Sequence, residues 1–543
     1  MSNGNLAVVL HAHLPFVRHP EHEVFLEEDW LFEAITETYV PLILAFQRLV
    51  RNRVTSCLTL SVSPTLAEML ADSLLQFRYL RYLESRIELS EQEVSRTRHS
   101  PDFHSLALMY RRNFWEAYTL FQSRYHGRLL DAFTELQQEG ILELITCPGT
   151  HPFMPFISRE EVRNAQLTMA RGSHGQHFGK QPRGLWLAEC GYEPGMDTLI
   201  KKAGFDYFIL DAHGLLFGKP RPPHGVFAPV KTPAGILSFG RDMESSLQVW
   251  NSKVGYPGDF NYREFYRDLG FEAPYEYIRP FLHPDGVRRN VGIKYYRITG
   301  GNDLSQRSPY DPQKAAVRAF QHASHFITQR RQQFDYLSRT LKVKPLVVSP
   351  YDAELFGHWW HEGPVFLEQV LLQAGTRWPD IRLVSLSEAA EEFSNPFPMQ
   401  PTGSSWGEEG YYRVWLNQNN RWIYKHQHWA ERAMVELADL FEDSGGLVER
   451  GLNQAGRELL LAQSSDWAFH MTYGNSSGYA ERRFTDHVAR FQCLRKGLLH
   501  NQLNLDFLGD LEGKDNLFGN LNYRIFRSTS DKDNRRDAGK LPD

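Results

Sequence analysis

Short apolar runs and longer amphipathic stretches alternate over about the first 400 residues of the chain. The apolar runs predict strands at residues 6–10, 141–145, 185–188, 207–210, 346–348 and 382–384. Helical periodicity with charged faces covers residues 29–53, 64–98, 104–139, 158–170, 196–203, 315–341 and 364–374. Strands that alternate with helices predict an α/β fold with a parallel sheet and crossover helices. Polar residues recur at the strand ends, which favours a closed barrel over an open sheet.

The pattern changes near residue 418, where long amphipathic helices begin at residues 419–443, 446–466 and 477–505. We therefore predict a barrel domain over residues 1–400 and a helical domain over residues 401–526. The barrel domain is expected to carry inserted helical segments at about 64–140 and long loops rich in Gly, Pro and aromatic residues at 214–290. Residues 527–543 have almost no large apolar side chains and are predicted to be a disordered tail.

Charge and cysteine content exclude several classes of function. The net charge of −5 comes from 60 basic and 65 acidic residues without a basic face, so nucleic acid is not an expected partner. The four cysteines form no CxxC pair, which argues against a cysteine zinc site or a disulfide framework. No apolar run has the length of a membrane span and no secretory signal precedes residue 11, so a soluble, cytoplasmic protein without membrane contact is expected.

Two predicted strands each deliver a carboxylate to their carboxyl end. Glu189 follows the apolar run 185–188 and precedes a Gly- and Pro-rich break, and Asp352 follows the strand at 346–348. Barrel enzymes carry catalytic groups at such strand ends. Tryptophans flank both acids, and aromatic faces suit the C–H faces of sugar rings, so the pair indicates two acids that act on a sugar. A helix cap or a loop anchor is the alternative interpretation of each carboxylate.

His11 and His13 lie two residues apart at the end of the first strand and should face the barrel interior. A zinc site is one interpretation, with His151 and Asp352 as further ligands. Neutral imidazoles that bind sugar hydroxyls are another, and two satisfied polar residues under a loop are a third.

Two later segments also place indoles beside polar residues. Trp406 lies in a Gly-flanked loop, where stacking on a substrate and loop anchoring are equally reasonable roles. Asp466 and Trp467 lie at a predicted helix end, where a helix cap followed by core aromatics explains them as well as a sugar-binding subsite does.

Five ordered segments resemble glycoside hydrolase family 57 and, within it, the 1,4-α-glucan branching enzymes. The segments are residues 11–15, 150–155, 186–192, 349–359 and 464–473. The resemblance spans about residues 5–525. It implies an incomplete (β/α)7 barrel with an inserted small domain and a C-terminal all-helical domain that completes the active site.

The resemblance also implies the chemistry. Glu189 takes the position of the nucleophile and Asp352 that of the acid/base in retaining cleavage of α-1,4-glucans such as amylose and glycogen. No metal and no cofactor is implied, and the expected assembly is a monomer or a small homo-oligomer. The residues expected to bind substrate are His11, His13, His151, Trp186, Trp359, Trp406, Asp466 and Trp467.

Two departures from the family concern the acceptor side. The resembled enzymes carry a loop tyrosine there, whereas this chain has no tyrosine between Tyr207 and Tyr256 and offers Phe227 on the corresponding loop. Phe271 stands where the family tends to have tryptophan. We therefore expect branching to be weak relative to hydrolysis. The alternatives are an amylase-like α-glucan hydrolase and a catalytically weak glucan-binding protein.

Overall fold

The computed structural model describes residues 3–54, 57–251, 255–300, 306–378, 380–474 and 476–528. Within these ranges, seven parallel strands follow one another in the order β8, β1, β2, β3, β4, β5 and β7. Their bounds are β1 (Gly4–Ala12), β2 (Leu58–Val62), β3 (Leu142–Ile145), β4 (Gly184–Leu185), β5 (Tyr207–Leu210), β7 (Leu237–Gly240) and β8 (Leu346–Asp352). A single parallel bridge between Thr146 and Leu185 joins β3 to β4.

The barrel is left open between β7 and β8, which do not pair as strands in the described ranges. The Asp242 N–H donates to the Val348 carbonyl at 2.8 Å, and helix α10 (Met243–Trp250) covers the gap. The hydroxyl of Ser349 on β8 donates to Ser245 of α10 at 2.7 Å. The predicted incomplete barrel is confirmed.

Three short strands lie beside the seven. Strand β9 (Ile381–Leu383) pairs with the start of β1, and β10 (Phe397–Pro398) pairs with β6 (Val230–Lys231). Strand β6 in turn runs antiparallel to β7. Apolar side chains fill the barrel interior, including those of Ala7, Val9, Ile145, Trp186, Tyr207, Ile209, Phe239, Leu346 and Val348.

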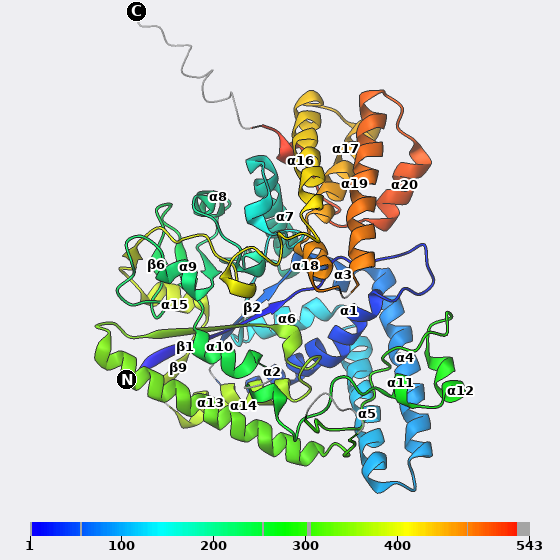
Figure 1. The fold of residues 1–543 in the computed structure, drawn as a ribbon, viewed down its shortest axis with the longest axis vertical. Coiled ribbons are helices and arrows are strands. Elements are labelled where there is room, and N and C mark those ends of the chain that lie inside the picture. The colour runs from blue at the N-terminus through cyan, green and yellow to red at the C-terminus, as the bar shows by residue number, and fades with distance from the viewer. Residues whose placement is uncertain are drawn as a thin grey trace, which may run out of the picture.

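Helices cover the outside of the sheet (Figure 1). Helix α1 (Glu28–Ala34) continues through a π-helix, η1 (Ile35–Tyr39), into α2 (Val40–Arg51). Between later strands run α7 (Glu160–Phe178), α8 (Met196–Lys202), α13 (Pro312–Thr340), α14 (Gly363–Arg377) and α15 (Leu386–Glu392). The helices predicted at 64–98 and 104–139 are observed as α3 (Pro64–Ala71), α4 (Ser73–Arg96), α5 (Pro101–Tyr118), the π-helix η2 (Thr119–Arg124) and α6 (Leu129–Gln138).

The segment predicted as long loops at 214–290 contains more regular structure than expected. It holds β6, β7, most of α9 (Ala212–Leu216), α10, α11 (Leu269–Glu272) and α12 (Tyr275–Ile278). Strand β7 is not predicted from the sequence, because its four residues, Leu-Ser-Phe-Gly, form an apolar run that is too short to indicate a strand. Pairing with β5 rather than local sequence preference fixes it as a strand.

The carboxyl-terminal part is helical and packs at one end of the molecule (Figure 1). Its helices are α16 (Trp422–Leu440), α17 (Gly446–Ala462), α18 (Ser465–Tyr473), α19 (Ser477–Leu499) and α20 (Leu505–Lys514). Ser528, near the start of the predicted tail, donates its backbone N–H to Asp439, and residues 529–543 of that tail lie outside the described residues. None of the helices described is both long and apolar enough to span a bilayer.

Candidate active site

Glu189 occupies a strained backbone position at the end of β4. The chain turns from the strand into a short 3-10 turn, η4 (Ala188–Cys190), in which Glu189 has φ 59° and ψ 21°. Cys190 follows with φ 50°. A residue other than glycine in this left-handed region costs on the order of 1–3 kcal/mol and persists where the surroundings enforce it, often at functional sites.

The Glu189 carboxylate accepts two side-chain hydrogen bonds. The indole N–H of Trp406 donates to Oε2 at 2.8 Å, and the Ser465 hydroxyl on α18 donates to Oε1 at 3.2 Å. The backbone N–H of Trp406 also donates to the Glu189 carbonyl at 3.0 Å. Burial raises the pKa of Glu189 to about 7, the Trp406 bond opposes that rise, and the charges of Asp466 and Asp352 add to it.

Asp352 ends strand β8 in register with His11 of β1. Burial and then the charge of Glu354 raise the pKa of Asp352 to about 7, while His13 and Arg241 oppose the rise. No hydrogen-bond donor reaches its carboxyl group from the residues that the structure describes. The two acids therefore share a raised pKa, but only Glu189 is held by donors.

Three histidines gather at the ends of β1 and β3, as predicted for His11 and His13. His11 stacks on Trp186 with ring centroids 4.7 Å apart, and its Nε2 lies 3.0 Å from Nε2 of His151. The other nitrogens of His11 and His151 meet the hydroxyls of Ser61 and Ser465, at 3.1 and 2.9 Å.

Burial lowers the pKa of both His11 and His151 well below the usual value, so both imidazoles are neutral. They are almost fully buried and have protein partners at all four ring nitrogens. No nitrogen of either ring is free in this conformation, and the direct contact with sugar hydroxyls stays a prediction. They position Ser465 and, through it, Glu189.

Asp466 links the helical part of the chain to the strand ends. Its carboxylate oxygens lie 3.0 and 3.2 Å from Nε2 of His13, whose Nδ1 meets the Ser63 hydroxyl at 3.0 Å. Burial alone would raise the pKa of Asp466, but the charge and hydrogen bond of His13 outweigh it and hold that pKa well below its usual range. Asp466 is therefore a carboxylate at every physiological pH.

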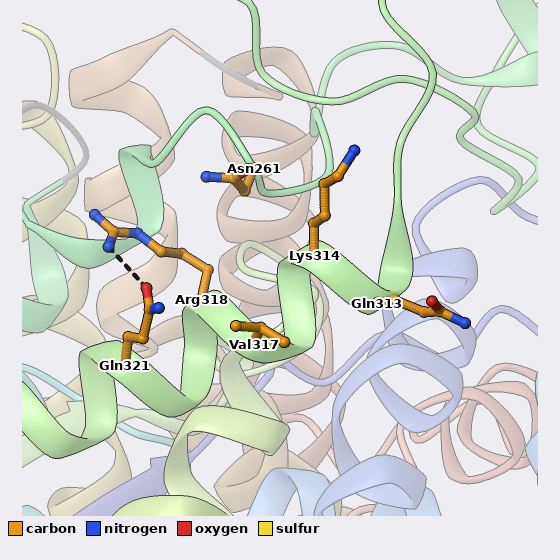
Figure 2. A pocket seen from close by; sticks show the side chains of 6 residues that line it. All are labelled: Asn261, Gln313, Lys314, Val317, Arg318 and Gln321. Atoms are coloured by element: carbon orange, nitrogen blue, oxygen red, sulfur yellow. Dashed lines mark hydrogen bonds between the residues drawn. The ribbon is translucent and has the colours of Figure 1, made fainter.

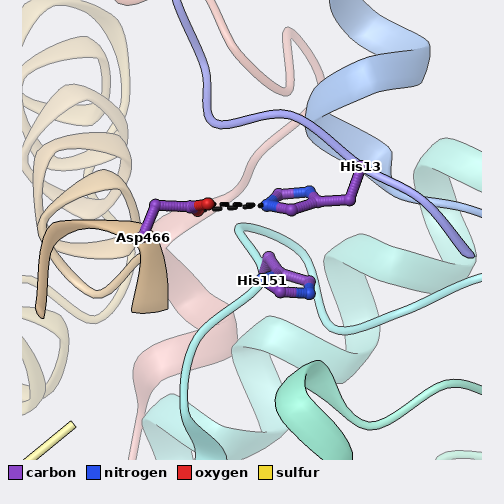
Figure 3. A group of neighbouring side chains, drawn as sticks. All are labelled: His13, His151 and Asp466. Atoms are coloured by element: carbon purple, nitrogen blue, oxygen red, sulfur yellow. Dashed lines mark hydrogen bonds and ion pairs between the residues drawn. The ribbon is translucent and has the colours of Figure 1, made fainter. Parts of the chain in front are cut away.

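His13, His151 and Asp466 lie close enough together to suggest a metal site (Figure 3). The rings of His13 and His151 are stacked, however, with centroids 3.6 Å apart and planes 17° from parallel. Lone pairs of imidazole nitrogens lie in the ring plane, so two stacked rings direct them along parallel lines rather than toward one ion at about 2.0–2.1 Å. The geometry of the three side chains favours a hydrogen-bonded cluster over a zinc site.

The four predicted sugar-stacking tryptophans divide into two pairs. Trp186 and Trp467 have no exposed surface, and Trp467 donates its indole N–H to the Leu461 carbonyl at 2.8 Å. Neither presents a face to a ligand in this conformation, and the stacking role stays a prediction. Trp406 is partly exposed, and Trp359 is 55% exposed with one face stacked on Phe265 at 4.6 Å.

Phe227 does not lie over the acid pair. Its carbonyl accepts a hydrogen bond of 2.9 Å from the N–H of Leu346, the first residue of β8. Asp352 is the last residue of that strand, and a seven-residue strand places the two ends about 20 Å apart. Phe227 therefore lies far from Asp352, and its role on the acceptor side stays a prediction. Phe271 lies on α11 with 52% of its surface exposed.

Three residues that contact the site were not singled out from the sequence. Ser465 donates to Glu189, and Glu354 accepts from the His13 backbone and from Tyr39. Ser465 and Glu354 fall inside the segments 464–473 and 349–359, so their motifs pointed to the right places. Tyr39 lies in an ordinary amphipathic helical stretch that offers no signal.

A separate pocket of about 340 Å³ opens at the start of α13 (Figure 2). It is lined by Asn261, Gln313, Lys314, Val317, Arg318 and Gln321. None of these residues carries a carboxylate. The Arg318 guanidinium donates hydrogen bonds to Gln321 and Asp259. The pocket is therefore not a second candidate for the acid chemistry.

Sequence and structure comparisons identify relatives of both parts of the chain. Residues 7–399 match glycosyl hydrolase family 57, and residues 426–526 match the family described as 1,4-alpha-glucan branching enzyme, C-terminal. A 1,4-alpha-glucan branching enzyme of Thermococcus kodakarensis is 31% identical over 95% of this chain and 77% of its own length.

Solved structures agree with these matches. The alpha-amylase AmyC of Thermotoga maritima has a TM-score of 0.90 and 42% identity, and the match covers 96% of this chain and 99% of that one. A GH57-type branching enzyme of Pyrococcus horikoshii has a TM-score of 0.87 and 32% identity over 97% of both chains. The resemblance found in the five sequence segments is confirmed, and the chain belongs to glycosyl hydrolase family 57.

Proposed function

We propose that this protein cleaves α-1,4-glucans with retention of configuration and transfers the product mainly to water. Glu189 attacks the anomeric carbon and forms a glycosyl-enzyme, while Asp352 gives its proton to the departing glycosidic oxygen. Asp352 then takes a proton from the acceptor that releases the sugar. The observation that carries the proposal is the unequal hydrogen bonding of two partly buried carboxyls, Glu189 after β4 and Asp352 at the end of β8.

The difference in hydrogen bonding assigns the role of nucleophile to Glu189 and the role of acid to Asp352. Hydrogen bonds to the ionised form of a carboxyl favour ionisation, and a neighbouring negative charge opposes it. Glu189 has donors in Trp406 and Ser465, which suit a nucleophile that must carry the charge. Asp352 has Glu354 as its neighbour and no donor among the described residues, which suits an acid that must keep its proton.

The exposed aromatic surface beside Asp352 suits a glucan chain. Trp359 donates its backbone N–H to the Glu354 carbonyl at 3.2 Å, which fixes its backbone to the turn that follows Asp352. Phe265 covers one face of Trp359, and the ring is 55% exposed. Stacking of a sugar on the free face would hold the substrate against the strand ends. Trp406, Asp466 and His13 complete the proposed substrate-binding set.

Hydrolysis is proposed to exceed branching because a 6-hydroxyl acceptor must be held in place while water is excluded. The segment between Tyr207 and Tyr256 has no tyrosine hydroxyl to bind such an acceptor. The 42% identity with an alpha-amylase is consistent with this preference.

A branching enzyme is the second candidate. It is favoured by the match of residues 426–526 to the carboxyl-terminal domain of branching enzymes and by the relatives named above. Amylose is the discriminating substrate, because hydrolysis creates one reducing end per cleavage whereas branching creates one α-1,6 linkage.

The test is a time course of new reducing ends and new α-1,6 linkages on amylose, with Glu189→Gln as the blank. We expect the ratio of α-1,6 linkages to reducing ends to stay well below one. A ratio well above one would establish branching as the main reaction. A protein that binds amylose but produces neither product would be a glucan-binding protein instead.

A further inference from the structure

Glu354 lies two residues beyond Asp352, in the short turn η7 (Ala353–Leu355) that follows β8. Its Oε1 accepts hydrogen bonds from the Tyr39 hydroxyl at 2.5 Å and from the His13 backbone N–H at 3.2 Å. The carboxylate is thus fixed between the end of β8, the end of β1 and the π-helix η1. A negative charge fixed next to a proposed acid opposes ionisation of that acid.

The π-helix holds the whole turn after Asp352. Glu37 of η1 lies 2.8 Å from Nδ1 of His358, and Thr38 accepts the His358 N–H at 3.1 Å. Gly357 has φ 124°, and a Cβ atom there would stand only 1.9 Å from the Glu37 carbonyl oxygen. The turn is therefore packed directly on η1, and π-helical segments are frequent at functional sites.

We propose that Glu354 is a positioning residue whose clamped negative charge keeps the proton on Asp352 in the resting enzyme. This inference rests on the proposed role of Asp352 as the acid. Two partly buried carboxyls that lie two residues apart do not ionise equally. The charge stays on Glu354, which has two donors, and the proton stays on Asp352, which has none in the described ranges.

The other charged groups around Asp352 and Glu354 do not move the proton from Asp352 to Glu354. His13 and Arg241 face Asp352 from the end of β1 and from the residue after β7, and both favour its ionised form. Glu189 faces it from η4 and opposes ionisation. Tyr39 and His13 face Glu354, and the nearby Glu37 is paired with His358. Burial raises the pKa of Glu354 to about 7, and its two hydrogen bonds counter that rise.

The test is the pH dependence of kcat/KM on amylose for Glu354→Gln. The amide oxygen can still accept from Tyr39 and His13, so the variant removes the charge and keeps the shape. We expect the alkaline limb of the profile to move down by about one pH unit, with about tenfold lower kcat/KM on the alkaline side. At the acid side, where Asp352 is protonated in both proteins, the rates should stay similar.

Two further variants separate this role from a purely structural one. Tyr39→Phe removes one donor and so disfavours the ionised form of Glu354 without removing the carboxyl group, and the limb should move in the same direction by a smaller amount. Glu276→Gln makes the same chemical change on α12, where the Glu276 side chain is 81% exposed, and should leave the profile unchanged. Melting temperatures confirm that each variant is folded.

The outcomes are distinct. An alkaline limb that stays in place or moves up in folded Glu354→Gln would overturn the inference, while the proposed function would stand. An equal loss of rate at every pH would also overturn it, because it would indicate a contact with substrate or a structural role. A wild-type protein without any cleavage of amylose would remove the proposed function, and the role of Glu354 would fall with it.

Discussion

Glu189, the proposed nucleophile, is held in position at the cost of local backbone strain. Its left-handed backbone conformation is enforced by the Trp406 N–H on its carbonyl and by the two donors on its carboxylate. Those contacts leave the side chain little freedom, so a substrate meets a carboxylate already in position. Positioning of this kind removes part of the entropic barrier of the reaction.

Glu189→Gln should reduce both hydrolysis and branching of amylose to background. The amide nearly preserves the shape of the side chain but cannot form the glycosyl-enzyme. The matched control is Glu436→Gln, since the Glu436 side chain is 69% exposed on α16. A Glu189→Gln variant with near wild-type rates would remove Glu189 from the proposed mechanism.

The pH profile of kcat/KM should be a narrow bell near neutral pH. Activity is lost as pH falls through the pKa of Glu189, which must be ionised, and as pH rises through that of Asp352, which must be protonated. Burial raises both pKa values to about 7, so the two limbs overlap and their apparent pKa values belong to the pair. A flat profile from about pH 5 to 9 would contradict this account.

Trp406→Phe should lower kcat on amylose by roughly ten- to a hundredfold, because a hydrogen bond to a charged group contributes about 1.5–3 kcal/mol. The phenyl ring keeps part of the aromatic surface and loses only the indole donor to Glu189. Trp115→Phe is the control, since Trp115 is 44% exposed on α5. Equal rates for Trp406→Phe and wild type would show that this donor is dispensable.

At the scale of helices and strands, the sequence predicts best where apolar runs are long or strand ends are polar. Strands β1 and β8 and the placement of Asp352 at a strand end follow from such runs. Strand β4 ends earlier than predicted because the backbone turns at η4, and that turn depends on contacts with Trp406 rather than on local preference.

The site could be predicted only in part, for physical reasons. Composition and spacing show that Trp186 and Trp467 are near the motifs, but they do not distinguish an indole in the barrel interior from one in an open cleft. The bond between Ser465 and Glu189 joins residues 276 positions apart. Similarly, the place of Phe227 beside Leu346 is set by the tertiary packing of a long segment and has no signal in the sequence.

Gly357→Ala should lower the melting temperature and the rate of amylose cleavage together. The new Cβ would collide with the Glu37 carbonyl in a left-handed position, and overpacking of this kind costs about 1–3 kcal/mol or more. Gly445→Ala is the control, because nothing lies within 4 Å of a Cβ there. An unchanged melting temperature for Gly357→Ala would show that the turn can move away from η1.

At the scale of the whole molecule, the proposed catalytic groups depend on both the barrel and the helices that follow it. Helix α18 brings Ser465 to Glu189 and Asp466 to His13. The Ser465 N–H also donates to the His151 carbonyl at 2.9 Å, so the contact includes the backbone. Movement of these helices relative to the barrel would therefore alter the solvation of the nucleophile.

Ser465→Ala should lower kcat on amylose by up to roughly tenfold, less than Trp406→Phe, because its hydrogen bond to Glu189 is long at 3.2 Å and contributes less than the ~1.5–3 kcal/mol of a well-formed bond to a charged group. KM should change little, since the hydroxyl binds Glu189 and His151 rather than substrate. Ser95→Ala is the control, since the Ser95 hydroxyl is exposed on α4 and bonds only its own helix. A large rise in KM at constant kcat would instead place Ser465 in substrate binding.

The central claim is that Glu189 and Asp352 cleave α-1,4-glucans through a glycosyl-enzyme. The most direct measurement follows the anomeric protons by NMR during the first minutes of maltoheptaose or amylose cleavage, before mutarotation mixes the products. We predict that the α-anomer of the new reducing end appears first, because two displacements at the anomeric carbon restore the original configuration. Initial appearance of the β-anomer would show a single displacement by water and would contradict the account.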